Sequence, residues 1–70
     1  MYLLDLLFTL PSGIDVRIKF DGNPDVFCLR TGRRNTGESA ARLTREGHCE
    51  SVVHDVIPLW STRELLIKCN

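Results

Sequence analysis

The 70-residue sequence lacks most of the devices that stabilise or anchor small proteins. Its cysteines are odd in number and widely spaced: Cys28, Cys49 and Cys69. We therefore expect no disulfide framework. The apolar residues 1–10 include Asp5 and stop at Pro11, well short of the roughly 20 residues that cross a bilayer. Because no basic stretch, apolar run and cleavage site open the chain, we expect a cytoplasmic protein with no membrane association.

The chain has little length from which to build a core. Each domain must enclose its own core, so residues 1–70 are expected to form a single domain. A core of this size rarely supplies more than roughly 3 to 5 kcal/mol, and small proteins commonly add disulfides, a metal or a second subunit. With disulfides set aside, a metal and a second subunit remain, and we expect a homodimer.

Residues that bind metals are present, but they do not cluster: Cys28, His48, Cys49, His54 and Cys69. Zinc sites usually hold two ligands in one turn, as in C-x2-C, and no such pair occurs. A cysteine with His54 and Asp55 supplies the residue types of nucleophilic catalysis. However, a substrate cleft of about 300 Å³ or more leaves little core in so small a domain. We therefore predict no enzyme activity, cofactor or metal, and cysteines that are buried or half-buried.

Hydrophobic periodicity predicts a helix followed by a hairpin in the first half of the chain. Leucines at helical spacing indicate a helix over residues 2–10, which Pro11 ends. Strict alternation of apolar and charged residues indicates a strand over residues 14–21. A turn sequence at residues 21–24 then leads to a second strand over residues 25–31. The second strand is almost continuously apolar, so the pattern does not say which of its faces points inward.

The second half predicts a short helix and another hairpin. A loop over residues 32–37 precedes a helix over residues 38–46, with Thr36 or Ser39 as its cap and Gly47 at its end. The apolar stripe of this helix is thin, so we expect it to dock weakly and to be mobile or to order on binding. Its apolar members are Ala40, Leu43 and Ala41.

Two strands close the chain, over residues 52–60 and residues 64–69. Pro58 cannot donate to a ladder, so the first of them lies at a sheet edge, bulges or ends there. The whole pattern predicts an α+β fold. An N-terminal helix packs on a mainly antiparallel sheet of about four strands, and a short second helix lies between the hairpins.

Charge is balanced overall but unevenly placed. The middle of the chain, residues 30–45, has five arginines, no lysine and one carboxylate, and acidic segments flank it. Its arginines are Arg30, Arg33, Arg34, Arg42 and Arg45. Guanidinium groups make paired hydrogen bonds with phosphates and carboxylates, so these arginines are candidates for binding a partner. The alternative is a solvated loop and the polar face of a small helix.

Trp60 is the only tryptophan and follows Pro58 near a predicted turn. If it is exposed, it is a candidate anchor for a partner, because tryptophan and arginine dominate the energetics of many interfaces. The alternative is that its side chain closes one end of the core.

The opening 4-LDLL-7, then 10-LPSG-13 and 16-VRI-18, together with a closing strand 65-LLI-67, resembles a group of small accessory proteins from phages and mobile elements of gut Firmicutes. Some proteins of that type inhibit bacterial defence systems, anti-CRISPR proteins among them. The resemblance covers both ends of the chain, leaves residues 30–50 unmatched and implies a function class, acting in the host cytosol. It transfers no functional residue.

Two functions follow from these observations. The first is a non-enzymatic inhibitor or adaptor that binds a protein through the arginine-rich segment, for which the resemblance implies a bacterial defence nuclease. The alternative is a small dimeric regulator that places the same arginines on nucleic-acid phosphates, although few aromatic residues lie nearby to stack on bases.

Overall fold

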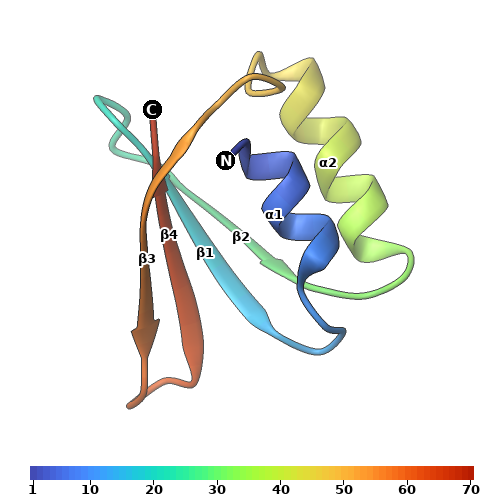
Figure 1. Ribbon diagram of the computed structural model, residues 1–70, viewed down its shortest axis with the longest axis vertical. Coiled ribbons are helices and arrows are strands. Elements are labelled where there is room, and N and C mark those ends of the chain that lie inside the picture. Colours follow the sequence, from blue (N-terminus) through green and yellow to red (C-terminus); the bar gives the residue numbers. More distant parts are fainter.

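The computed structural model describes all residues, 1–70, and contains two helices and four strands (Figure 1). In chain order the elements are α1 (Leu3–Thr9), β1 (Asp15–Phe20), β2 (Val26–Arg30), α2 (Asn35–Arg45), β3 (Val53–Leu59) and β4 (Glu64–Cys69). This is the predicted order of helix, hairpin, short helix and hairpin, and the α+β class is confirmed. Neither helix has the length and hydrophobicity needed to span a membrane.

The four strands form one sheet in the order β2-β1-β4-β3. Each hairpin is antiparallel, so the predicted mainly antiparallel sheet is confirmed. The two hairpins meet through a parallel pairing of β1 with β4, in which Val16 lies opposite Leu65 and Ile18 opposite Ile67. Parallel strands need a long crossover, and the segment that contains α2 supplies it.

Both helices lie on the same side of the sheet (Figure 1). Alternate residues of β1 point towards them, and Val16, Ile18 and Phe20 are buried there. The same cluster takes Leu3 and Leu7 from α1, Leu43 from α2, and Ile67 and Cys69 from β4. The residues of β1 between the buried ones point to the opposite face, which no helix covers.

Helix α2 is held by few side chains. Leu43 is its one large buried residue, and Thr36 and Ala40 are the small ones, whereas Ala41 is exposed. The thin stripe predicted from the sequence is therefore confirmed for Ala40 and Leu43. The predicted caps, Thr36 or Ser39, are wrong, because the helix begins at Asn35. The hydroxyl of Thr36 instead accepts a bond from the Gly32 N–H at 3.1 Å and ties the preceding loop to the helix.

The end of α2 is as predicted. Gly47 has φ +88°, a conformation that glycine adopts without steric cost. Its N–H donates to the Thr44 carbonyl at 3.1 Å, and the His48 N–H donates to the Leu43 carbonyl at 2.9 Å. These two bonds satisfy carbonyls of the last turn in the arrangement known as a Schellman motif.

Strand β3 forms one edge of the sheet, as the proline within it suggested. The register between β3 and β4 shifts between Val53 and Asp55, which marks a bulge. Pro58 lies opposite Leu65. An edge strand has a neighbour on one side only. The N–H that Pro58 lacks would point to the open side, so no hydrogen bond of the ladder is lost.

Candidate partner-binding surfaces

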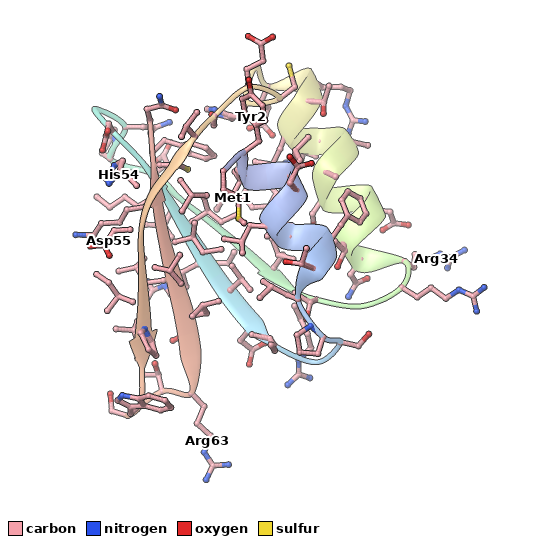
Figure 2. The ribbon with its side chains drawn as sticks, viewed as in Figure 1. Met1, Tyr2, Arg34, His54, Asp55 and Arg63 are labelled. Atoms are coloured by element: carbon pink, nitrogen blue, oxygen red, sulfur yellow. The ribbon has the colours of Figure 1, made fainter.

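Three of the five candidate arginines lie on one face of α2. Arg34, Arg42 and Arg45 recur at helical spacing on the side opposite Leu43, and all three are exposed. We call these three residues the α2 arginine face. Arg34 lies at its N-terminal end and projects away from the sheet (Figure 2).

Two members of the α2 arginine face make ion pairs along the helix. Arg34 Nε lies 3.6 Å from a carboxylate oxygen of Glu38, and Arg42 Nε lies 2.9 Å from one of Glu46. The Arg42 guanidinium also lies 4.8 Å from the centre of the Phe27 ring, in a cation–π contact. Arg45 makes no ion pair. Exposed pairs of this kind are worth only about 0 to 1 kcal/mol, so a phosphate or carboxylate of a partner can replace them.

The other two candidate arginines lie elsewhere. Arg30 is on β2, and its Nε lies 3.2 Å from a carboxylate oxygen of Asp15 on the uncovered face of the sheet. Arg33 is in the loop before α2, beside the end of α1, where it lines a hollow of about 190 Å³ with Leu7 and Phe8. The five candidate arginines therefore do not form one continuous surface, because the sheet separates Arg30 from the α2 arginine face.

Trp60 lies in the turn between β3 and β4, and 84% of its surface is exposed. The alternative that it closes the core is therefore wrong. Its side chain borders a hollow of about 530 Å³ lined by Ile14, Pro58, Leu59, Trp60, Arg63, Glu64 and Leu65. We call this set the Trp60 surface. Contiguous exposed apolar side chains with a polar rim are typical of sites where proteins bind one another.

The Trp60 surface and the α2 arginine face are far apart. Arg63, which belongs to the Trp60 surface, projects from the tip of the β3–β4 turn, whereas Arg34 projects from the start of α2 on the other side of the molecule (Figure 2). The two surfaces can therefore act independently.

The Trp60 surface also contains an unusual backbone conformation. Arg63 has φ +57°, and it is the one residue other than glycine with a positive φ. Such a backbone costs of order 1 kcal/mol or more and is found in tight turns and at functional sites.

Sequence reasoning identified Trp60 but not the residues around it. Pro58 and Leu59 directly precede Trp60 in the chain, so the sequence alone predicts that they lie beside it. Ile14 precedes β1, and Leu65 belongs to β4. Leu65 lies opposite Pro58 within the β3–β4 hairpin, whereas Ile14 reaches Trp60 only through the parallel pairing of β1 with β4, which has no local signal in the sequence.

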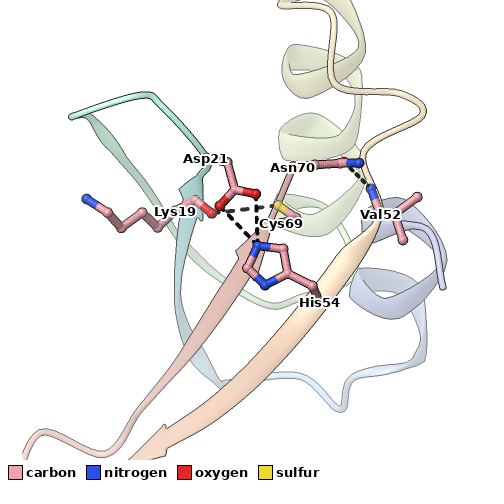
Figure 3. Close-up of polar contacts among 6 residues, drawn as sticks. All are labelled: Lys19, Asp21, Val52, His54, Cys69 and Asn70. Carbon is pink, nitrogen blue, oxygen red and sulfur yellow. Dashed lines mark hydrogen bonds and ion pairs between the residues drawn. The ribbon is translucent and has the colours of Figure 1, made fainter.

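The cysteines and histidines are dispersed, and no three potential ligands are placed to hold a metal ion. Cys28 and Cys49 are exposed, which corrects the expectation of burial for both, and Cys69 is buried as expected. The Cys69 thiol donates to the Lys19 carbonyl at 3.8 Å (Figure 3). Burial, and next the charge of Asp21, raise the pKa of this thiol from 9.0 to about 11. A thiol that stays protonated is a poor nucleophile and metal ligand.

His54 is held by a partner other than the neighbouring Asp55. Its Nε2 lies 3.0 Å from a carboxylate oxygen of Asp21, in the loop after β1 (Figure 3). His48 stacks on the Phe20 ring with the ring centres 3.7 Å apart. The trio of a cysteine, His54 and Asp55 considered from the sequence is therefore not assembled.

No protein family, curated protein or solved structure matches the chain.

Proposed function

We propose that this chain is a non-enzymatic protein-binding module, an inhibitor or adaptor, whose main contact with its partner is the Trp60 surface. The observation that carries the proposal is the 84% exposure of Trp60 beside an apolar hollow of about 530 Å³. A covered aromatic side chain buries about 150 to 250 Å². At about 25 cal/mol per Å², covering Trp60 contributes several kcal/mol before the costs of association.

The rest of the Trp60 surface supports the same use. Arg63 and Glu64 line the hollow together with its apolar residues, so charged and apolar side chains lie side by side there. Interfaces combine a desolvated centre with a polar rim. Tryptophan and arginine are also the residue types most enriched among those that dominate binding energy.

Replacing Trp60 with alanine is expected to weaken partner binding by about 2 kcal/mol or more, roughly 30-fold. Partners captured by the wild-type chain are first identified and purified, and calorimetry then gives the affinity of each variant. Trp60 lies outside the core, so its variant is expected to keep the wild-type circular dichroism spectrum. Phe8→Ala is the matched control, because Phe8 is an aromatic residue, 62% exposed, that lies outside the Trp60 surface. Equal affinities of the wild type and Trp60→Ala would exclude this surface.

The narrower proposal is that the partner handles nucleic acid, as a bacterial defence nuclease does. It rests on the resemblance of the two ends of the chain to small phage accessory proteins. Defence nucleases are accordingly the first partners to assay with the Trp60 and Phe8 variants.

A second candidate function is binding of nucleic acid, and the α2 arginine face favours it. Three guanidinium groups on one exposed helix face can contact successive phosphates along a backbone. The opposing observation is the small surplus of charge, since Glu38 and Glu46 lie among these arginines. The candidate is therefore ranked second.

If nucleic acid is bound, gel shifts in low salt are expected to show retardation of duplex DNA or RNA that weakens steeply as salt is added. The expected slope of log affinity against log salt is about −0.9 per phosphate neutralised. Replacing Arg34 and Arg45 together with alanine should make the slope shallower by nearly two, whereas Arg63→Ala, outside α2, should leave it unchanged. Absence of retardation in low salt would remove this candidate.

A further inference from the structure

The two edges of the sheet are protected to different degrees. On the β3 side, Pro58 lacks an N–H and a bulge follows Val53. The N-terminal residues also pair with the start of β3, where the Val53 N–H donates to the Met1 carbonyl at 2.9 Å and Tyr2 forms a bridge with Val52. Prolines, bulges and covering segments are the means by which proteins prevent an edge strand from pairing with another chain.

The β2 edge carries none of these devices. Its five residues contain no proline, and its register with β1 is continuous from Asp15 opposite Arg30 to Lys19 opposite Val26. None of the backbone hydrogen bonds outside the helices and ladders involves a residue of β2. The outer side of this strand is therefore an unpaired row of donors and acceptors.

The direction of these groups follows from the residue after the strand. The Thr31 N–H donates to the Ile14 carbonyl at 2.8 Å, so Thr31 directs its backbone groups towards β1. Backbone groups alternate along a strand, and thus Leu29 and Phe27 also face β1. The residues with N–H and C=O groups at the free edge are Val26, Cys28 and Arg30.

This edge is complementary to itself. In an antiparallel pairing of two β2 strands about a two-fold axis at Cys28, Cys28 lies opposite Cys28 of the second copy. Val26 then lies opposite Arg30, and Phe27 opposite Leu29. Val26, Cys28 and Arg30 then each donate and accept a backbone hydrogen bond with the second copy. Phe27 and Leu29 are half-buried in the single chain, and in this pairing Phe27 of each copy covers Leu29 of the other.

The surroundings of the β2 edge leave room for a second strand. A groove of about 360 Å³ runs beside it, lined by Val26, Phe27 and Cys28 on the strand and by Arg42 and Glu46 on α2. The groove presents a cation and a carboxylate on each copy, so a two-fold axis sets groups of opposite sign in the shared space. The Trp60 surface lies across the sheet, next to β3, and stays free.

We propose that two copies of this chain associate through their β2 edges, in antiparallel register about a two-fold axis at Cys28, to form one continuous sheet. A second copy is favoured over an unrelated extended peptide because the outward backbone groups of Val26, Cys28 and Arg30 are placed symmetrically about Cys28, and the apolar Phe27 and Leu29 flank it. The small core gives a further reason, since only 12 of 70 residues are buried in the single chain and domains of this size commonly gain stability from a second subunit. The proposal is independent of what the Trp60 surface binds.

Light scattering over a range of concentrations tests the association with matched variants. The wild type is expected at twice the chain mass. Cys28→Lys sets two like charges opposite each other at the axis, and we expect dimer affinity to fall at least tenfold. Val56→Lys places the same charge at an exposed position of the other edge strand and should leave the dimer intact. A wild-type monomer at millimolar concentration, or a dimer sensitive to Val56→Lys and not to Cys28→Lys, would overturn the proposal.

Hydrogen exchange in the wild-type chain tests the register without any substitution. The amides of Val26, Cys28 and Arg30 are expected to exchange rapidly in dilute solution and to become protected as the concentration rises. The amide of Val56 on the β3 edge should show no such dependence. A dimer in which the three β2 amides keep exchanging rapidly would overturn the proposed pairing.

Discussion

Replacing Leu43 with alanine is expected to lower the free energy of unfolding by about 2 to 5 kcal/mol and to detach α2 from the sheet. Leu43 is fully buried, at 0% exposure, and it is the only large side chain that α2 contributes to the core. The other buried residues of the helix, Thr36 and Ala40, offer little apolar area in its place. Because a domain of this size rarely has more than roughly 3 to 5 kcal/mol in reserve, the variant should lie close to its unfolding midpoint at room temperature.

Urea unfolding gives the size of the Leu43 effect, and amide exchange shows where it acts. The amides of α2 should lose protection before those of β1 and β4. Leu66→Ala is the control, because Leu66 is half-buried on β4 and is not part of the core cluster. It removes the same atoms from a less buried site, so the expected loss is roughly 1 kcal/mol. Equal losses for the two variants would contradict the view that Leu43 alone anchors the helix.

The elements of the fold were predictable where local chemistry decides them. Alternation over β1 admits only a half-buried strand, and Pro11 and Gly47 end the two helices for reasons of backbone geometry that hold in any context. The start of α2 was not predictable in this way. The Thr36 hydroxyl, expected to cap a helix, bonds the Gly32 N–H once the helix begins earlier at Asn35.

The parallel pairing of β1 with β4 had no local signal. It joins residues about 50 positions apart, and both strands would satisfy their own hairpins equally well without it. Its stability comes from the shared core under the helices, where Ile18 meets Ile67. Only the three-dimensional arrangement shows that Ile14 lies beside Leu65 and Trp60.

The arginine-rich segment was correctly seen as a charged region but not as several separate sites. Because β2 is almost continuously apolar, its sequence does not show which of its residues face the helices. It therefore does not show on which face of the sheet Arg30 lies. Register resolves this, because Leu29 lies opposite the buried Val16, and Arg30 must then face the uncovered side. The later start of α2 expected from the sequence also left Arg34 in a loop, away from the helix face that it shares with Arg45.

Raising the pH from about 9 to about 11 is expected to remove about 2 kcal/mol of stability through Cys69. In the folded chain, burial and the charge of Asp21 raise the pKa of this thiol to about 11, against 9.0 for an unperturbed cysteine. The unfolded state therefore releases the thiol proton first as the pH rises. Between these two pH values the Cys69 thiol ionises in the unfolded state and stays protonated in the folded state, which favours unfolding. The contribution of Cys69 to stability is therefore fully present below pH 9.0 and is lost as the pH passes through about 11.

Cys69→Ala isolates this contribution from the other groups that titrate at high pH. The variant is expected to be less stable at neutral pH, because it leaves a small cavity beside Ile67 and Phe20. Its free energy of unfolding should nevertheless fall less than that of the wild type between pH 9 and 11. The difference between the two plots of unfolding free energy against pH gives the contribution of Cys69. Iodoacetamide provides an independent measurement in the folded chain, since it should modify the exposed Cys28 and Cys49 and spare the protonated, buried thiol. Parallel stability curves, together with rapid modification of Cys69, would show that this thiol is not held neutral by the core.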